Sequence, residues 1–238
     1  MPSRGSPSPG NGAQSDWRPV VAHYEKTFAR HGANPKGVDW PDGRDLEARF
    51  AVQLEVAARI TPGRPVRLLD VGCGPGLLID YLKQVDRAHA FEYVGIDLSP
   101  TMIEAARTRW PEHAFHVHDL TSDPVAFGLF DIAIMNGVLT ERVSLTESQM
   151  GELARRIVRS AYAATTVGLA FNVMSKHVDF ERDDLFHWGF DEVAGFLKKE
   201  VTRHFDFRSA YGLYEYTVHA WHEFQRPPPL GRQEWWSR

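Results

Sequence analysis

The chain has 238 residues, which is enough for one large α/β domain and too few for two full-sized domains joined by a linker. Hydrophobic residues make up 43% of it and charged residues 24%, as in ordinary globular proteins, which excludes a disordered or fibrous chain. The net charge of −4 shows no excess of basic residues that could bind the phosphates of a nucleic acid, so we expect a small-molecule substrate and no nucleic-acid partner.

Cys73 is the single cysteine, so the chain cannot form an intrachain disulfide. No run of about 18 apolar residues is present to span a bilayer, and the first residues lack the apolar segment of a signal peptide. We therefore expect a cytoplasmic protein without a membrane partner. The sequence leaves open whether it is a monomer or a homodimer.

Both ends of the chain have the composition of tails. Residues 1–16 are rich in Pro, Ser and Gly and cannot bury enough apolar surface to become ordered, so we expect a disordered segment. Residues 225–238 contain a proline run followed by two tryptophans, which could dock on the body of the protein or on another subunit. Between the tails we expect a single domain over 17–224, with an N-terminal cap at 17–60 and a core at 61–224.

From residue 66 onward, short apolar runs alternate with stretches of helical periodicity, which is the pattern of βαβ units around a parallel sheet. The last two expected strands form a hairpin whose turn contains Gly212. The expected strands lie at residues 66–71, 92–97, 114–120, 130–136, 167–174, 203–210 and 213–221. Helices are expected over 76–82, from residue 100, from residue 147 and over 191–201.

Two of the expected helices begin with clear capping signals. Ser99 is a favourable N-cap and is followed by Pro100 at the first helical position. Thr146 and Gln149 have the spacing of a capping box ahead of a long amphipathic stretch. These signals fix where the second and third helices start.

A glycine-rich loop connects the first expected strand to its helix, in the segment Asp70-Val71-Gly72-Cys73-Gly74-Pro75-Gly76. Glycines there allow a sharp turn and let the backbone approach a ligand closely. The carboxyl end of a parallel strand is also where open α/β sheets bind ligands. We therefore expect a ligand site at this loop.

Acidic residues follow the next two strands. Asp97 ends the second strand, where its carboxylate could accept hydrogen bonds from both hydroxyls of a ribose. Asp119 ends the third strand and could accept a hydrogen bond from an adenine amino group. Taken alone, each acid could be a helix cap or a loop residue, but the ordered set favours an adenosyl ligand.

A nicotinamide dinucleotide is the alternative ligand, since its fingerprint is G-x-G-x-x-G with an acid about 20 residues later. Here Leu77 stands where the third glycine of that fingerprint should fall. Asp70 would also repel a pyrophosphate, whereas a ligand with an ammonium and a sulfonium group would tolerate it. Both residues disfavour the dinucleotide.

These motifs resemble those of the class I S-adenosylmethionine (SAM)-dependent methyltransferases. LLDVGCGPG is similar to their first motif, GIDLSP to the second, HDL to the third and FDIAIMNGVL to the fourth, so that the resemblance covers about residues 60–140. It implies a Rossmann-like α/β fold with a mostly parallel seven-stranded sheet, an antiparallel last strand and helices on both faces. Residues 165–222 more loosely resemble methyltransferases found beside surface-polysaccharide and natural-product genes.

The resemblance also implies where SAM lies. The backbone from Gly72 to Gly76 would hold its methionine portion, Asp97 its ribose, and Asp119 with Leu120 its adenine. Asn136 and Gly137 would lie near the amino group or the transferred methyl group. The complete set of expected cofactor-binding residues is Tyr24, Arg49, Asp70, Gly72, Cys73, Gly74, Gly76, Asp97, Leu98, Met102, Asp119, Leu120, Asn136 and Gly137.

Two long segments, 17–50 and 174–190, lack regular apolar periodicity and are rich in Trp, Tyr, His and charged residues. We expect them to form a mobile cover over the acceptor pocket. Within the first segment, Tyr24 could cover the cofactor, and Arg49 could pair either with the SAM carboxylate or with an acid at the surface.

Candidates for the acceptor side lie beyond the fifth strand, which Asn172 closes. His177 and His187 are candidate general bases, although each could equally be a solvated loop histidine. The histidines between residues 113 and 118 have no cysteine or acid pattern to complete a metal site, so no metal is expected.

The function expected from the sequence is SAM-dependent methyl transfer to an oxygen or nitrogen of a small molecule, with a sugar or a natural-product intermediate as examples. The alternatives are an oxidoreductase that uses NAD(P) and a SAM-binding regulator without turnover.

Overall fold

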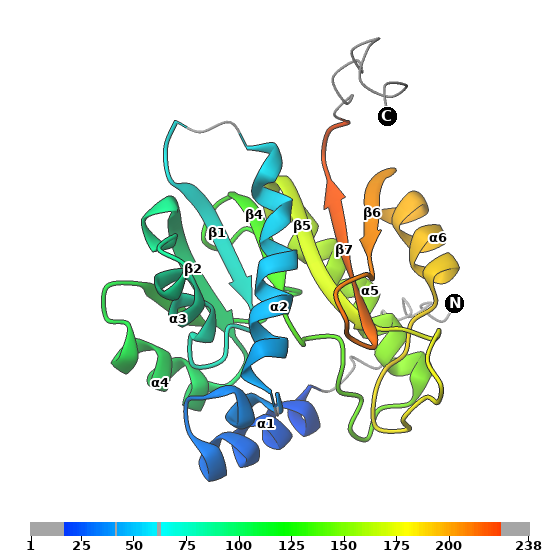
Figure 1. Cartoon of the computed structure of the whole chain (residues 1–238), viewed down its shortest axis with the longest axis horizontal. Coiled ribbons are helices and arrows are strands. Elements are labelled where there is room, and N and C mark those ends of the chain that lie inside the picture. The colour runs from blue at the N-terminus through cyan, green and yellow to red at the C-terminus, as the bar shows by residue number, and fades with distance from the viewer. Residues whose placement is uncertain (1–16, 41, 61–62, 225–238) are drawn as a thin grey trace, which may run out of the picture.

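The computed structural model describes residues 17–40, 42–60 and 63–224, so the two expected tails lie outside the described residues. Within these ranges seven strands form one sheet in the order β3-β2-β1-β4-β5-β7-β6 (Figure 1). The strands are β1 (Val66–Val71), β2 (Phe91–Asp97), β3 (Ala114–Val117), β4 (Phe130–Met135), β5 (Thr165–Met174), β6 (His204–Arg208) and β7 (Glu215–Trp221). The helices are α1 (Arg18–His31), α2 (Gly43–Leu54), α3 (Leu77–Gln84), α4 (Pro100–Arg109), α5 (Glu147–Ala163) and α6 (Phe190–Glu200).

The sheet is parallel except for one strand. β1 pairs in parallel with β2 on one side and with β4 on the other. β7 runs antiparallel to both of its neighbours, β5 and β6. The expected α/β class, with a mostly parallel seven-stranded sheet and an antiparallel last strand, is confirmed.

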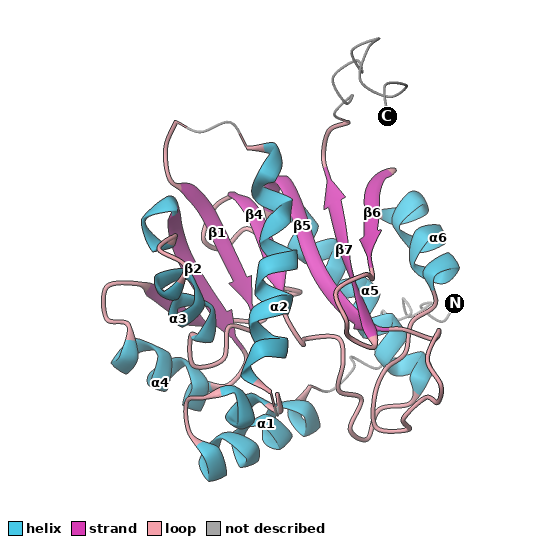
Figure 2. Cartoon of the chain, in the orientation of Figure 1, coloured by secondary structure: helices cyan, strands magenta, loops and turns pink. Residues whose placement is uncertain are grey.

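Helices cover both faces of the sheet, as Figure 2 shows. One apolar layer joins the sheet to α2, α3 and α4 through Phe50, Leu78 and Ile103. The other layer joins it to α5 and α6, where Leu153 and Phe196 are buried. Because both faces are covered, the central strands are apolar throughout, and polar residues are displaced to the strand ends.

The predicted helix starts are confirmed in atomic detail. Ser99 Oγ accepts the N–H of Met102 at 3.1 Å and α4 begins at Pro100. The Thr146 hydroxyl accepts the N–H of Gln149 at 3.2 Å, and the Gln149 side chain accepts the N–H of Thr146 at 2.9 Å. The capping box therefore satisfies two backbone donors at the start of α5.

The third strand is shorter than predicted, because β3 ends at Val117 and not at residue 120. Asp119 Oδ1 instead accepts the backbone N–H of Thr121 at 2.8 Å, which forms a local turn. Such a side-chain bond competes with the sheet ladder and ends the strand early. None of the helices in the described part of the chain combines the length and the apolar character that a membrane-spanning segment needs.

Candidate functional site

The carboxyl ends of β1, β2 and β4 point toward the N-terminal helix α1 (Figure 1). Residues of α1 and of these strand ends line one cavity. Twelve of the predicted cofactor-binding residues line it: Tyr24, Asp70, Gly72, Cys73, Gly74, Asp97, Leu98, Met102, Asp119, Leu120, Asn136 and Gly137. Arg49 and Gly76 do not belong to the lining. The cavity therefore lies where the motifs predicted a ligand.

The glycines of the loop adopt conformations that suit glycine alone. Gly72, Gly74 and Gly76 have φ angles of +72°, +52° and +79°. A Cβ atom at Gly72 would lie 2.5 Å from a methyl carbon of Val138, and one at Gly76 would lie 2.7 Å from the Trp110 ring. At Gly76 the backbone thus approaches a packed indole, which is why this residue is required by the fold but does not line the cavity.

Asp97 holds the loop in place. Its two carboxylate oxygens accept the N–H of Gly74 at 2.9 Å and the N–H of Ser99 at 2.8 Å. Burial raises the pKa of Asp97, and these N–H donors act in the opposite direction. A carboxylate offers about four lone-pair sites, so two remain for donors of a bound molecule.

Asp70 lies at the end of β1 and is buried, with 3% of its surface exposed. The Tyr93 hydroxyl donates a hydrogen bond to it at 2.7 Å. Burial raises the pKa of Asp70 to about 7, so that its charge can respond to a cation placed beside it. A positively charged ligand group would favour the ionised form.

Asp119 stands at the far side of the cavity. It is half-buried, and its Oδ1 also accepts the hydroxyl of Thr121 at 2.7 Å. Leu120, next in the chain, is buried and provides an apolar surface beside it. A flat ring with a donor group would fit this combination.

Of the two segments expected to cover the acceptor pocket, 17–50 contributes residues to the cavity lining and 174–190 contributes none, while their mobility stays a prediction. Tyr24 from α1 and Trp40 from the following loop line the cavity, together with Phe50 of α2. Burial raises the pKa of Tyr24, and Glu141 and Asp39 raise it further. Sequence reasoning missed the apolar residues Trp17, Val20 and Val21 of α1, which follow the helical spacing of Tyr24 and could have been found from it.

Arg49 forms a buried ion pair and not the surface pair that the sequence suggested as an alternative. Its Nε lies 2.8 Å from Glu215 Oε1, with 8% and 1% of the two side chains exposed. Its guanidinium carbon lies 3.8 Å from the centre of the Trp40 ring. The pairing of Arg49 with the SAM carboxylate stays a prediction.

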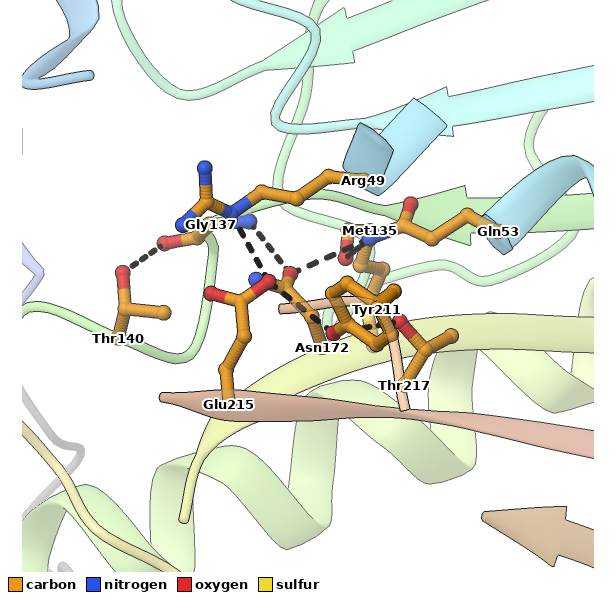
Figure 3. Close-up of polar contacts among 9 residues, drawn as sticks. All are labelled: Arg49, Gln53, Met135, Gly137, Thr140, Asn172, Tyr211, Glu215 and Thr217. Atoms are coloured by element: carbon orange, nitrogen blue, oxygen red, sulfur yellow. Dashed lines mark hydrogen bonds and ion pairs between the residues drawn. The ribbon is translucent and has the colours of Figure 1, made fainter. Parts of the chain in front are cut away.

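Figure 3 shows that Arg49 belongs to a polar cluster built from α2, β5, β7 and the loop before β7. We use this name for Arg49, Gln53, Asn172, Tyr211 and Glu215. Asn172 Oδ1 accepts the N–H of Gly137 at 2.8 Å and the amide of Gln53 at 3.2 Å. The Tyr211 hydroxyl donates to Glu215 Oε1 at 3.2 Å.

The cluster lies directly behind Gly137 and therefore beside the cavity. Asn172 was an expected acceptor-side residue, whereas Gln53, Tyr211 and Glu215 were missed. A glutamate at the start of a strand in which Tyr216, Val218, Ala220 and Trp221 are apolar or aromatic was the signal that could have revealed Glu215.

The two candidate bases do not line the cavity. His187 is buried, its Nδ1 lies 2.7 Å from the carbonyl oxygen of Ser175, and its Nε2 accepts the N–H of Arg182 at 3.3 Å. Both ring nitrogens are thus bonded to backbone. His177 is exposed and stacks on Phe190, with 5.4 Å between ring centres.

The sequence matches the model of a family described as "Methyltransferase domain" over residues 68–161. It is 27% identical over 160 residues to the proposed methyltransferase Rv1506c of Mycobacterium tuberculosis, a match that covers 65% of this chain and 92% of that protein. Other curated relatives are matched over about a third of their own length, 33% and 30% for the next two.

Solved structures show the same fold. Magnesium protoporphyrin IX methyltransferase from Synechocystis PCC 6803, with bound SAH, has a TM-score of 0.61 at 16% identity and covers 87% of this chain and all of its own. The 1,6-didemethyltoxoflavin-N1-methyltransferase of Burkholderia thailandensis has a TM-score of 0.59 at 19% identity and covers 91% of this chain and 92% of its own.

Proposed function

Since this chain is a class I SAM-dependent methyltransferase, with SAM as its cofactor, we propose that it methylates an oxygen or nitrogen atom of a small molecule. When bound, SAM supplies a methyl group on a sulfonium, so that the S–CH₃ bond breaks as the O–CH₃ or N–CH₃ bond forms. The acceptor loses a proton, and S-adenosylhomocysteine (SAH) is the second product.

The observation that carries the proposal is the arrangement of three acids and a glycine loop around one cavity. Gly72 and Gly74 bring backbone close to the cavity, and the buried Asp70 offers a carboxyl for an ammonium or sulfonium group. Asn136 Oδ1 is buried without a hydrogen-bond partner at the same place, so it is available to a donor. The donors and acceptors present thus fit SAM.

We assign roles along the bound cofactor on this basis. The Gly72–Gly74 backbone, Asp70 and Asn136 would hold the methionine end, and Asp97 would accept the ribose hydroxyls with its two remaining lone-pair sites. Asp119 and Leu120 would hold the adenine, with Leu98 and Met102 packing against it.

Alignment and exclusion of water are the main tasks of the protein in such an in-line displacement. Tyr24 and Phe50 line the cavity from the N-terminal side and would contribute to both. The general-base role of His177 and His187 stays a prediction without geometric support, because neither lines the cavity.

A small acceptor is supported by a cavity that side chains of α1 and α2 partly cover, and by the negative net charge. The structural neighbours named above act on magnesium protoporphyrin IX and on 1,6-didemethyltoxoflavin, which are ring compounds of limited size. As part of the proposal, we extend a small ring compound as the acceptor to the present chain. We also propose that the chain acts as a monomer or homodimer and has no nucleic-acid partner.

Calorimetry and a methyl-transfer screen test the proposal. SAM and SAH should bind with one site per chain, while NAD⁺ at the same concentration should not. Radiolabelled methyl groups should then appear on a member of a panel of sugars, phenols, amines and amides. Transfer to ribosomal RNA alone would contradict the small-molecule acceptor, and SAM binding without transfer to any panel member or RNA would favour the regulator.

A further inference from the structure

The polar cluster contains buried hydrogen-bonding atoms that the fold does not use. Four of its atoms are buried without a hydrogen-bond partner, namely Arg49 Nη1, Gln53 Oε1, Asn172 Nδ2 and Glu215 Oε2, and Asn136 Oδ1 after β4 is in the same state. Leaving such an atom unsatisfied costs about 1–3 kcal/mol. Native structures contain few such groups, so several at one place, beside a ligand cavity, indicate that a ligand completes them.

Trp40 lies between Arg49 and the cofactor cavity. Its ring lies over the Arg49 guanidinium at 3.8 Å and also lines the cavity. A Cβ atom at Gly137 would lie 2.8 Å from Cζ2 of the same indole. The indole therefore fills a slot that Arg49 and Gly137 border, beside the place where we position the methyl group.

The charges in the cluster balance without a ligand. Arg49 and Glu215 form a pair, while Gln53 and Asn172 are neutral amides. Burial raises the pKa of Glu215, and Arg49 opposes that shift. A carboxylate or an ammonium brought into this slot would add an uncompensated buried charge, which is costly, whereas a neutral group with one donor and one acceptor would not.

We propose that the slot occupied by Trp40 is the acceptor subsite and that it takes an uncharged planar ring carrying both a hydrogen-bond donor and an acceptor. The acceptor replaces the indole on the Arg49 guanidinium, and its hydrogen-bond donor and acceptor meet the unpartnered atoms of the polar cluster. This inference rests on the proposed function, because the slot is defined by its place beside the SAM cavity.

The test uses three probes with the same ring and different charge: benzamide, benzoate and benzylamine. Each is titrated at pH 7.5 into the full chain saturated with SAH, and binding is followed by saturation-transfer NMR and calorimetry. Benzamide should bind at least about tenfold more tightly than the two charged probes, the factor that corresponds to about 1.4 kcal/mol. Stronger binding of benzoate or benzylamine overturns the proposal.

Trp40→Ala tests whether the indole occupies the subsite. Removal of a competing side chain increases the population of the open slot, so benzamide should bind this variant several-fold more tightly than the unaltered chain. Equal or weaker binding, or no binding of benzamide to either protein while SAH still binds, overturns the proposal. Loss of SAH binding by the unaltered chain would instead contradict the proposed function.

The double variant Arg49→Met/Glu215→Gln removes the ion pair and leaves no buried charge. It should lose benzamide binding, and its affinity for SAH decides between the subsite and the predicted pairing of Arg49 with the SAM carboxylate. If SAH affinity falls as well, Arg49 belongs to the cofactor site and the subsite assignment is wrong. Arg64→Met/Asp131→Asn is the control, because it removes a more exposed Arg–Asp ion pair at the opposite end of the strands, and it should keep both affinities. Should the first double variant fail to fold, the Trp40→Ala comparison still decides.

Discussion

Asp97→Ala should weaken SAM binding in a way that can be calculated from the structure. Each oxygen of Asp97 accepts one backbone N–H, from Gly74 and from Ser99, so two of about four lone-pair sites are free. Two ribose hydroxyls would use both. The substitution therefore removes two charge-assisted hydrogen bonds to the cofactor and also releases the glycine loop that Asp97 positions.

The expected loss is about 1–3 kcal/mol of binding free energy, or roughly 5- to 150-fold in the dissociation constant. The value stays below the sum for two bonds to a charged group, because water solvates the ribose hydroxyls in the unbound state. Asp97→Asn keeps one acceptor oxygen but places an amide opposite an N–H donor. Its affinity should lie between those of the alanine variant and the unaltered chain.

Isothermal calorimetry with SAM and with SAH is the assay, and thermal unfolding of each variant shows whether the fold is retained. Asp131→Ala is the control, since this carboxylate also accepts a backbone N–H, from Arg67 at 2.8 Å, but lies at the opposite end of the sheet. An unchanged dissociation constant for a folded Asp97→Ala protein would refute the ribose assignment. An equal loss in the control would show that the effect is global.

Three other predictions follow from the same geometry. Asp70, with a pKa raised to about 7, becomes ionised between pH 6 and 8 and then attracts the cationic cofactor more strongly. SAM affinity measured by calorimetry should therefore rise up to roughly tenfold from pH 6 to pH 8, and Asp70→Asn should abolish this pH dependence. Gly76→Ala places a Cβ 2.7 Å from the Trp110 ring at a φ of +79° and should lower stability by about 1–3 kcal/mol, measured by urea unfolding. Thr146→Ala removes the capping box with Gln149 and should cost about 0.5–2 kcal/mol in the same assay, with SAM affinity unchanged.

The cofactor half of the site could be predicted because each of its residues is tied to a local pattern. Asp70, Asp97 and Asn136 each lie at or next to the end of an apolar strand, and parallel strands bring such ends to one edge of the sheet. The glycine spacing then indicates where backbone approaches the ligand. Gly76 marks the limit of this reasoning, since the sequence shows that a glycine is needed but not that Trp110 is the reason.

The acceptor half depends on contacts that no local pattern records. Arg49 and Glu215 are 166 residues apart, and they meet because β7 inserts antiparallel beside β5. That register pairs Glu215 with Met174, which lies two residues from Asn172 in β5. Glu215 and Asn172 therefore lie on the same face of the sheet and complete the polar cluster behind Gly137. An antiparallel last strand can be expected from the sequence, but its register cannot, because a shift of one residue would turn Glu215 to the other face. If the polar cluster binds the acceptor as proposed, substitutions at the start of β7 are expected to alter acceptor choice before they alter SAM binding, which a methyl-transfer screen beside calorimetry with SAM would measure.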